Sequence, residues 1–106
     1  TSGTNGSGAI VQHLTTTGAG ANPSLNLAAL DPSGNNAIIA FSGNWLNPYG
    51  GTSESGWAEL FDSGCTDPSD PYGAYVTYKL ATTDNSILIT AAATDWILFG
   101  MEIKAL

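Results

Sequence analysis

Acidic side chains gather in one stretch of this sequence, where Asp62, Asp67 and Asp70 flank or alternate with Pro68 and Pro71. Carboxylate oxygens on a proline-stiffened loop can hold Ca²⁺. The spacing matches no EF-hand loop, however, and an aspartate beside a proline commonly accepts hydrogen bonds from nearby backbone amides. We therefore favour turn capping over Ca²⁺ binding for the three aspartates, and we expect no cofactor.

The sequence contains few residues that could carry out catalysis. The chain has one histidine, His13, and one cysteine, Cys65, which rules out an internal disulfide and leaves a metal shell incomplete. No Gly-x-Ser-x-Gly segment marks a nucleophilic serine. Glu54 and Glu59, together with these aspartates, offer carboxylates for a glycosidase pair, but so small a domain is not expected to hold the wide cleft that such a pair needs. We expect a protein that is not an enzyme.

Aromatic residues form a second group, in and beside two long loops. Aromatic rings stack on sugar faces and also dominate protein–protein hot spots. The residues that we take as a candidate binding set are Trp45, Tyr49, Tyr72 and Tyr75. Packing in the core is the alternative for any of them, and we favour that role for Trp57 and Trp96 because each begins a predicted strand.

Composition narrows the class of partner. The 106 residues include nine acids, two lysines and no arginine, giving a formal net charge of -7. This charge repels phosphate backbones and anionic lipid headgroups, so we expect no nucleic-acid partner. No apolar run approaches the ~20 residues that span a bilayer, and we expect no membrane partner. Charged residues make up 10% of the chain, so hydroxyl and amide side chains must cover much of the surface.

The elements that position these side chains are strands. Residues 1–8 contain mainly Gly, Ser and Thr and are predicted to form a flexible arm before a single domain over residues 9–106. Alternating apolar and polar residues between Gly-, Pro- and Asn-rich turns predict an antiparallel β-sandwich or jelly-roll of about seven to eight strands. The predicted strands are residues 9–17, a short segment around Leu25 and Leu27, and residues 37–45, 57–62, 73–82, 86–92 and 95–106.

Two of these strands carry a prediction about their faces. Residues 37–45 begin with an uncharged apolar run, which predicts a strand buried on both faces. In the last strand, Ile97, Phe99, Met101 and Ile103 alternate with Trp96, Gly100, Glu102 and Lys104. The apolar set is predicted to face the core and the set ending in charges to face solvent.

Three segments carry a family resemblance: Ser-Gly-Trp-Ala-Glu-Leu at 55–60, Ala-Tyr-Val-Thr-Tyr-Lys-Leu-Ala-Thr at 74–82, and Asp-Trp-Ile-Leu-Phe-Gly-Met-Glu-Ile at 95–103. In this order they resemble small β-sandwich modules of tailed-phage virion proteins and bacterial surface proteins. The resemblance implies non-enzymatic structural, decoration or adhesion roles. It supplies no catalytic residues.

Three hypotheses follow. The first is a virion structural protein, a capsid decoration or tail-associated protein whose partners are copies of itself and a major capsid or tail protein. The second is a glycan-binding or adhesion module that uses the aromatic set. The third is a pilus-like fibre subunit that donates its N-terminal arm as a strand to a neighbour. The last two would place the protein outside the cell or on the cell surface.

Overall fold

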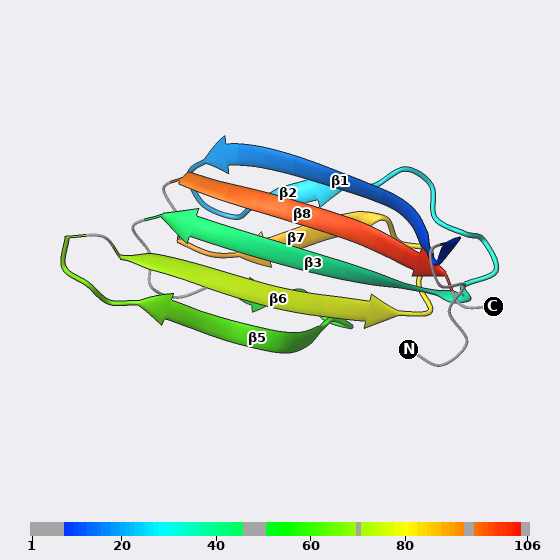
Figure 1. Ribbon diagram of the computed structural model, residues 1–106. Coiled ribbons are helices and arrows are strands. Elements are labelled where there is room, and N and C mark those ends of the chain that lie inside the picture. Colours follow the sequence, from blue (N-terminus) through cyan, green and yellow to red (C-terminus); the bar gives the residue numbers. More distant parts are fainter. Residues whose placement is uncertain (1–7, 46–50, 70, 93–94, 105–106) are drawn as a thin grey trace.

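A computed structural model describes residues 8–45, 51–69, 71–92 and 95–104, which contain eight strands in two antiparallel sheets (Figure 1). The predicted β-sandwich is thus confirmed. The strands are β1 (Ile10–Ala19), β2 (Ser24–Asn26), β3 (Asn36–Trp45), β4 (Thr52–Ser53), β5 (Ala58–Cys65), β6 (Tyr72–Leu80), β7 (Ser86–Thr90) and β8 (Asp95–Lys104). Nearly all of the expected N-terminal arm, residues 1–7, lies outside the described residues.

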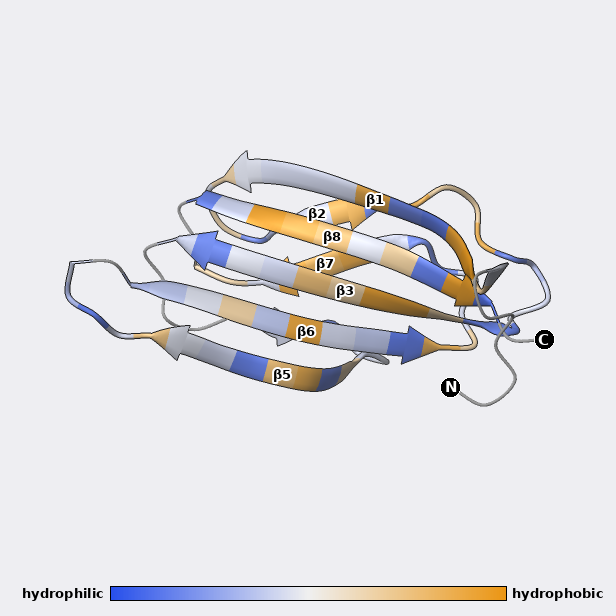
Figure 2. Cartoon of the chain, in the orientation of Figure 1, coloured by the Kyte–Doolittle hydropathy of each residue, from blue (hydrophilic) through white to orange (hydrophobic). Residues whose placement is uncertain are grey.

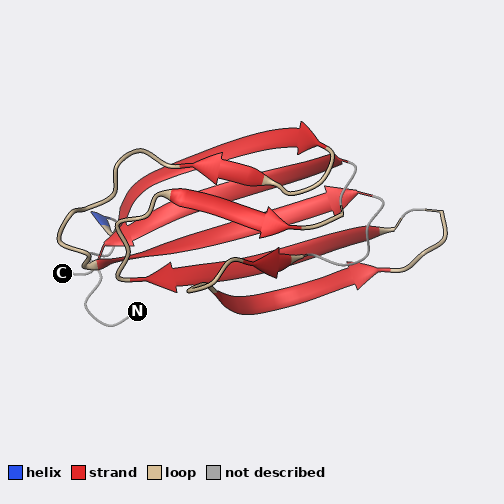
Figure 3. Ribbon diagram, turned by 180° about the vertical axis from the view of Figure 1, so that it is seen from behind, coloured by secondary structure: helices blue, strands red, loops and turns tan. Residues whose placement is uncertain are grey.

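The larger sheet has five strands in the order β1-β8-β3-β6-β5, and the smaller has three in the order β2-β7-β4. In the view from behind, the small sheet lies in front of the large sheet and covers part of it (Figure 3). Successive strands lie in different sheets except β5 and β6, which pair with each other in the large sheet. The strand β3 pairs with β8 and β6, which are distant from it in sequence. The two long loops, predicted at residues 47–56 and 63–72, both contain strand residues. β4 lies within the first, and β5 extends to Cys65 in the second.

The core lies between the sheets. The small sheet and its flanks contribute Leu25, Leu27, Ile87, Ile89 and Ala91, and the large sheet contributes Ile38, Ala40, Tyr75 and Leu98. Those that belong to strands come from alternate positions, as a period of two requires, and Leu27 and Ala91 directly follow β2 and β7. Gly100 lets the sheets approach closely, because a Cβ there would lie 2.5 Å from Ile87 Cδ1.

The predicted faces of β8 are wrong. Leu98 and Glu102 are fully buried, whereas Ile97 is exposed, so the set with the carboxylate faces the core. Hydrogen bonds explain the inversion, because Gln12 and Asn36 both donate to Glu102 and offset the cost of burying it.

The prediction that residues 37–45 are buried on both faces is also wrong for one face. On β3, Ile38 and Ala40 are buried and Phe41 is exposed. β3 is central within its sheet, but the small sheet covers one side of it only. Figure 2 shows that the strands of the large sheet carry many hydrophobic residues. Burial and register place Phe41 and Ile97 among them on the side away from the small sheet.

Candidate functional site

The outward side of the five-stranded sheet is the most unusual surface of the molecule. We call it the outer face, defined as the side of the sheet that carries Phe41 and Phe99. Cross-strand partners share a face, so the register assembles rows across all five strands. One row is Thr15, Phe99, Phe41, Val76 and Phe61; the next is His13, Met101, Ile39, Tyr78 and Ala58. Both rows are largely apolar.

The outer face is almost without charge. Among the described residues whose register places them on it, Asp95 alone carries a fixed charge, and it lies at the end of β8. His13 lies on the same face and stacks on Phe99, with ring centroids 6.1 Å apart. A strand face that meets water normally carries polar residues, so this face has the composition of an interface or core.

The outward side of the small sheet differs. Its register places Ser24, Asn26, Thr52, Ser86, Leu88 and Thr90 there. Five of these six side chains are polar, as expected for a solvated sheet face. The unusual apolar surface therefore belongs to one side of the sandwich.

A shallow groove of about 930 Å³ crosses one end of the outer face. Trp45 and Tyr72 are cross-strand partners beside it, and both are about half exposed, at 47% and 52%. Gly43 and Ala74, also cross-strand partners, provide little side-chain bulk in the adjoining row. Asp95 pairs with Trp45, so a carboxylate and two aromatic rings share one row along the groove.

The predicted aromatic set is divided by the fold. Trp45 and Tyr72 come together, but Tyr75 is 2% exposed and faces the core. Its hydroxyl lies 2.7 Å from Ser53 Oγ, on β4 of the opposite sheet. Tyr49 lies outside the described residues. Trp57 and Trp96, expected to cap the core, are packed against it.

The acidic cluster does not assemble among the described residues. Asp62 and Asp67 are exposed, and Asp70 lies outside the described part of the chain. Asp67 Oδ1 accepts a hydrogen bond from the backbone N–H of Ser69 at 2.8 Å, which is turn capping. Within the described residues, no three His, Cys, Asp or Glu side chains are grouped to hold a metal ion.

Cys65 has a free thiol and lies on the outer face at the end of β5. It is the cross-strand partner of Tyr72 and is half-buried. His13 lies at the other edge of the sheet, on β1. The two side chains are therefore too far apart in the sheet for the histidine to activate the thiol.

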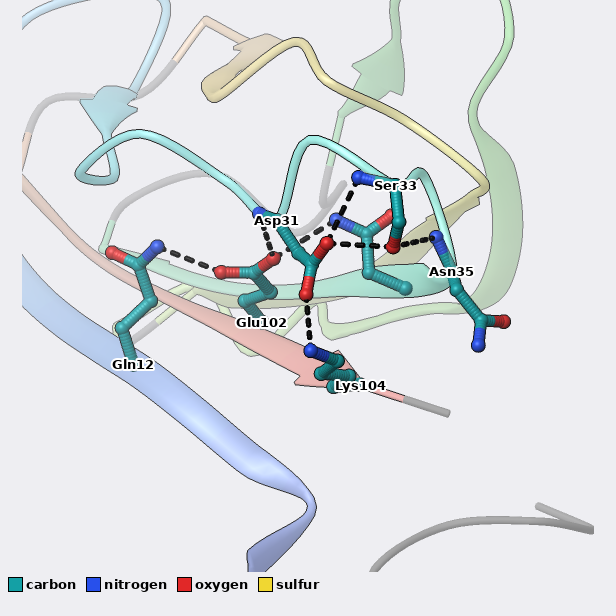
Figure 4. A network of polar contacts seen from close by, with 7 residues as sticks. Gln12, Asp31, Ser33, Asn35, Glu102 and Lys104 are labelled. Atoms are coloured by element: carbon teal, nitrogen blue, oxygen red, sulfur yellow. Dashed lines mark hydrogen bonds and ion pairs between the residues drawn. The ribbon is translucent and has the colours of Figure 1, made fainter. Parts of the chain in front are cut away.

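A polar network closes the end of the sandwich opposite the groove (Figure 4). Glu102 accepts hydrogen bonds from Gln12 Nε2, the Asp31 backbone N–H and Asn36 Nδ2, at 2.8 to 2.9 Å. Burial raises the pKa of Glu102, but these three hydrogen bonds outweigh it and lower the pKa below its ordinary value. Asp31 also pairs with Lys104, whose hydrogen bond lowers the pKa of Asp31 well below its usual range. The network ties the segment after β2 to the large sheet, so we assign it a structural role.

Phe41, Phe61, Ile97 and Asp95 belong to the candidate surface but were not in the predicted set. The alternation of β8 identifies Ile97 as part of one face but predicts that this face lies in the core. Correct pairing of β8 with β3 would have joined Ile97 to Gly43 and Phe99 to Phe41. The missing information was the register between strands far apart in sequence.

Comparison with known proteins gives no relative: no family model, curated protein or solved structure matches this chain. In the described part of the chain there is no helix of the length and apolar character needed to cross a membrane.

Proposed function

We propose that this protein is a non-enzymatic structural protein that acts through subunit contacts made by its outer face, as a capsid decoration or tail-associated protein of a virus particle. The near absence of charge on that face is the observation that carries the proposal. The resemblance of residues 55–60, 74–82 and 95–103 to virion modules supports the setting in a particle.

The size of the face supports a protein partner. The five strands have eight to ten residues each. At ~4.8 Å between strands and ~3.3 Å per residue they give a face of about 24 by 30 Å, or ~700 Å². The largest apolar patch on an ordinary monomer is ~300–600 Å², and a standard interface buries ~800 Å² per partner. The outer face as a whole therefore approaches the area that a standard interface buries on each partner.

Charge elsewhere on the molecule suits this role. Asp62 and Glu59 belong to β5, but their register puts them on the side opposite Phe61. The net charge of -7 thus keeps copies apart except where the outer face meets a partner. Acids on the remaining surface also oppose non-specific contact.

The first experiment measures the mass of the purified protein by light scattering across concentrations, with electron microscopy of the same sample. We expect association that Phe61→Ser weakens, because Phe61 is half exposed on the outer face. Leu88→Ser is the matched control, since Leu88 lies on the outward side of the small sheet. A monomer at every concentration, or equal sensitivity to both changes, would contradict docking between copies through this face.

Glycan binding is the second candidate, favoured by the groove. Trp45 and Tyr72 offer two adjacent aromatic rings for the C–H faces of a sugar, and Asp95 offers an acceptor for its hydroxyls. The net charge selects against anionic sugars, so a neutral chain is the expected ligand. This candidate and subunit docking compete, because the groove is part of the outer face.

Cellohexaose is a suitable probe for the glycan candidate, used at a protein concentration where light scattering finds a monomer. Saturable binding by calorimetry that Tyr72→Ala abolishes, with unchanged thermal unfolding, would favour the glycan function. Unchanged binding in the Tyr72→Ala variant would place any sugar contact outside the groove.

A further inference from the structure

Phe41 occupies the centre of the outer face. It lies on β3, the third of five strands, and is the third of the five residues of β3 that point outward. Its neighbours across the sheet are Phe99 and Val76, and the side chain is 41% exposed. A surface meant to meet a copy of itself must be self-complementary about its centre, so the residues on either side of Phe41 are decisive.

Bulk is distributed unequally on the two sides of the Phe41 row. Toward the groove, the next row holds the cross-strand pair Gly43 and Ala74. Away from the groove, the next row holds the pair Ile39 and Tyr78 on the same two strands. On β3 and β6 the first row is hollow, whereas the second row, at equal distance from Phe41, is filled. Ile97 of β8 borders the hollow beside Gly43.

We propose that the occupant of the outer face is a second copy of this chain, docked face to face about a two-fold axis that runs across the strands at Phe41. The inference rests on the proposed function of the face as a docking surface. Such an axis places each strand of one copy over the same strand of the other copy, and the two strands run in opposite directions. The Gly43 and Ala74 hollow of one copy then receives Ile39 and Tyr78 of the other.

Charge fits the same arrangement. The axis places the row of Asp95 over the row of Ile103, at the opposite end of β8, so the two Asp95 carboxylates do not meet. A copy of a chain with net charge -7 approaches most readily where its own acids are few, and among the described residues of the outer face Asp95 is the single acid.

The area also fits. Two copies that each cover ~700 Å² would bury about 1,400 Å² in total, within the ~1,200–2,000 Å² of stable interfaces. Sheets that pack face to face keep their strands within about 30° of each other, which the stacking of each strand on its counterpart satisfies. The result is a closed dimer rather than an open fibre.

A charge exchange at Phe41 tests the inference. Because Phe41 meets Phe41 at the axis, Phe41→Asp alone and Phe41→Lys alone should each weaken dimerisation by about 100-fold or more, through like charges across the interface. An equimolar mixture of the two variants should recover a complex of twice the monomer mass, at least tenfold tighter than either variant alone. Sedimentation equilibrium gives the masses and constants, with Leu88→Asp as the control that should dimerise like the unchanged protein.

Each outcome decides. Thermal unfolding of the variants separates lost pairing from lost folding, and Phe41→Ser gives a neutral variant that should also weaken the dimer. Phe41→Asp could abolish association while the equimolar mixture with Phe41→Lys fails to restore it. That result would overturn the two-fold axis and leave the proposed function standing. Particles larger than two copies would do the same. A monomeric unchanged protein would overturn the dimer and would leave a capsid or tail protein as the partner that the proposed function requires.

Discussion

Asn36 donates a hydrogen bond from Nδ2 to Oε1 of Glu102 at 2.9 Å, and both residues are buried at the end of the sandwich. Asn36 Oδ1 accepts from the backbone N–H of Thr82 at 3.1 Å, so the amide uses both ends. Glu102 receives the Asp31 backbone N–H at 2.9 Å on the same oxygen. These two side chains thereby join the segments before β3, after β6 and within β8.

Glu102→Gln should destabilise the fold. In the unchanged protein, Gln12 Nε2 donates a hydrogen bond to the Glu102 carboxylate. The replacement amide keeps one acceptor oxygen but turns an NH₂ group toward Gln12 Nε2, so that two donors face each other. A buried hydrogen-bonding group left unpaired costs about 1–3 kcal/mol, and denaturant unfolding should show a loss of that size. Glu59→Gln, at an exposed position, is the control and should change stability by less than about 0.5 kcal/mol. Equal stability of the two variants would mean that the network contributes little.

Stability should fall in acid. Because the pKa of Glu102 is lower in the folded chain than in the unfolded one, its contribution is complete above the unfolded value and is lost as the pH falls through the folded value. The lowered pKa of Asp31 acts in the same direction. The melting temperature should thus stay level down to about pH 5 and decrease below that, toward and past the ordinary Glu pKa of ~4.3. Glu102→Gln should reduce this decrease; a profile identical to that of the unchanged protein would contradict the assignment.

The fold class followed from the sequence, but the faces of β8 did not. Period-two alternation specifies two faces and leaves open which one is covered. Hydrophobicity alone predicts that Ile97 and Phe99 are buried and that Glu102 is exposed. The partners that make the burial of Glu102 possible, Gln12 and Asn36, are 90 and 66 residues away in the chain. Only the tertiary arrangement reveals them.

The candidate site was predictable in part. Trp45 and Tyr72 were selected as aromatic residues at loop edges, and they are cross-strand partners. Tyr75 was grouped with Tyr72, although a separation of three places two residues of one strand on opposite faces. That odd spacing was available in the sequence. The opposite role of Tyr75 could have been predicted once β6 was taken to include Tyr72.

Gly100→Ala should destabilise more than Gly43→Ala. A Cβ at Gly100 would lie 2.5 Å from Ile87 Cδ1 in the core, and overpacking of this kind costs about 1–3 kcal/mol. A Cβ at Gly43 would lie 3.3 Å from Ile97 Cγ2, on the outer face, where Ile97 can move. Denaturant unfolding of both variants measures the difference. If Gly43→Ala cost as much as Gly100→Ala, the outer face would be as tightly packed as the core.

Tyr75→Phe and Tyr72→Phe should separate the core role from the surface role. Ser53 Oγ donates to Thr77 Oγ1 at 2.7 Å, and Thr77 Oγ1 donates to the Ala58 carbonyl at 2.9 Å. Each hydroxyl has one proton, so Tyr75 must donate to Ser53, and the chain of donors links β6, β4 and β5.

Removing the Tyr75 hydroxyl should therefore cost about 0.5–1.5 kcal/mol of unfolding free energy, whereas removing the exposed Tyr72 hydroxyl should cost almost none. Denaturant unfolding checks the first expectation. Light scattering checks that Tyr75→Phe associates like the unchanged protein, since its ring faces away from the outer face. Weaker association of folded Tyr75→Phe would show that the inner layer of the sandwich, and not the outer face alone, controls how copies meet.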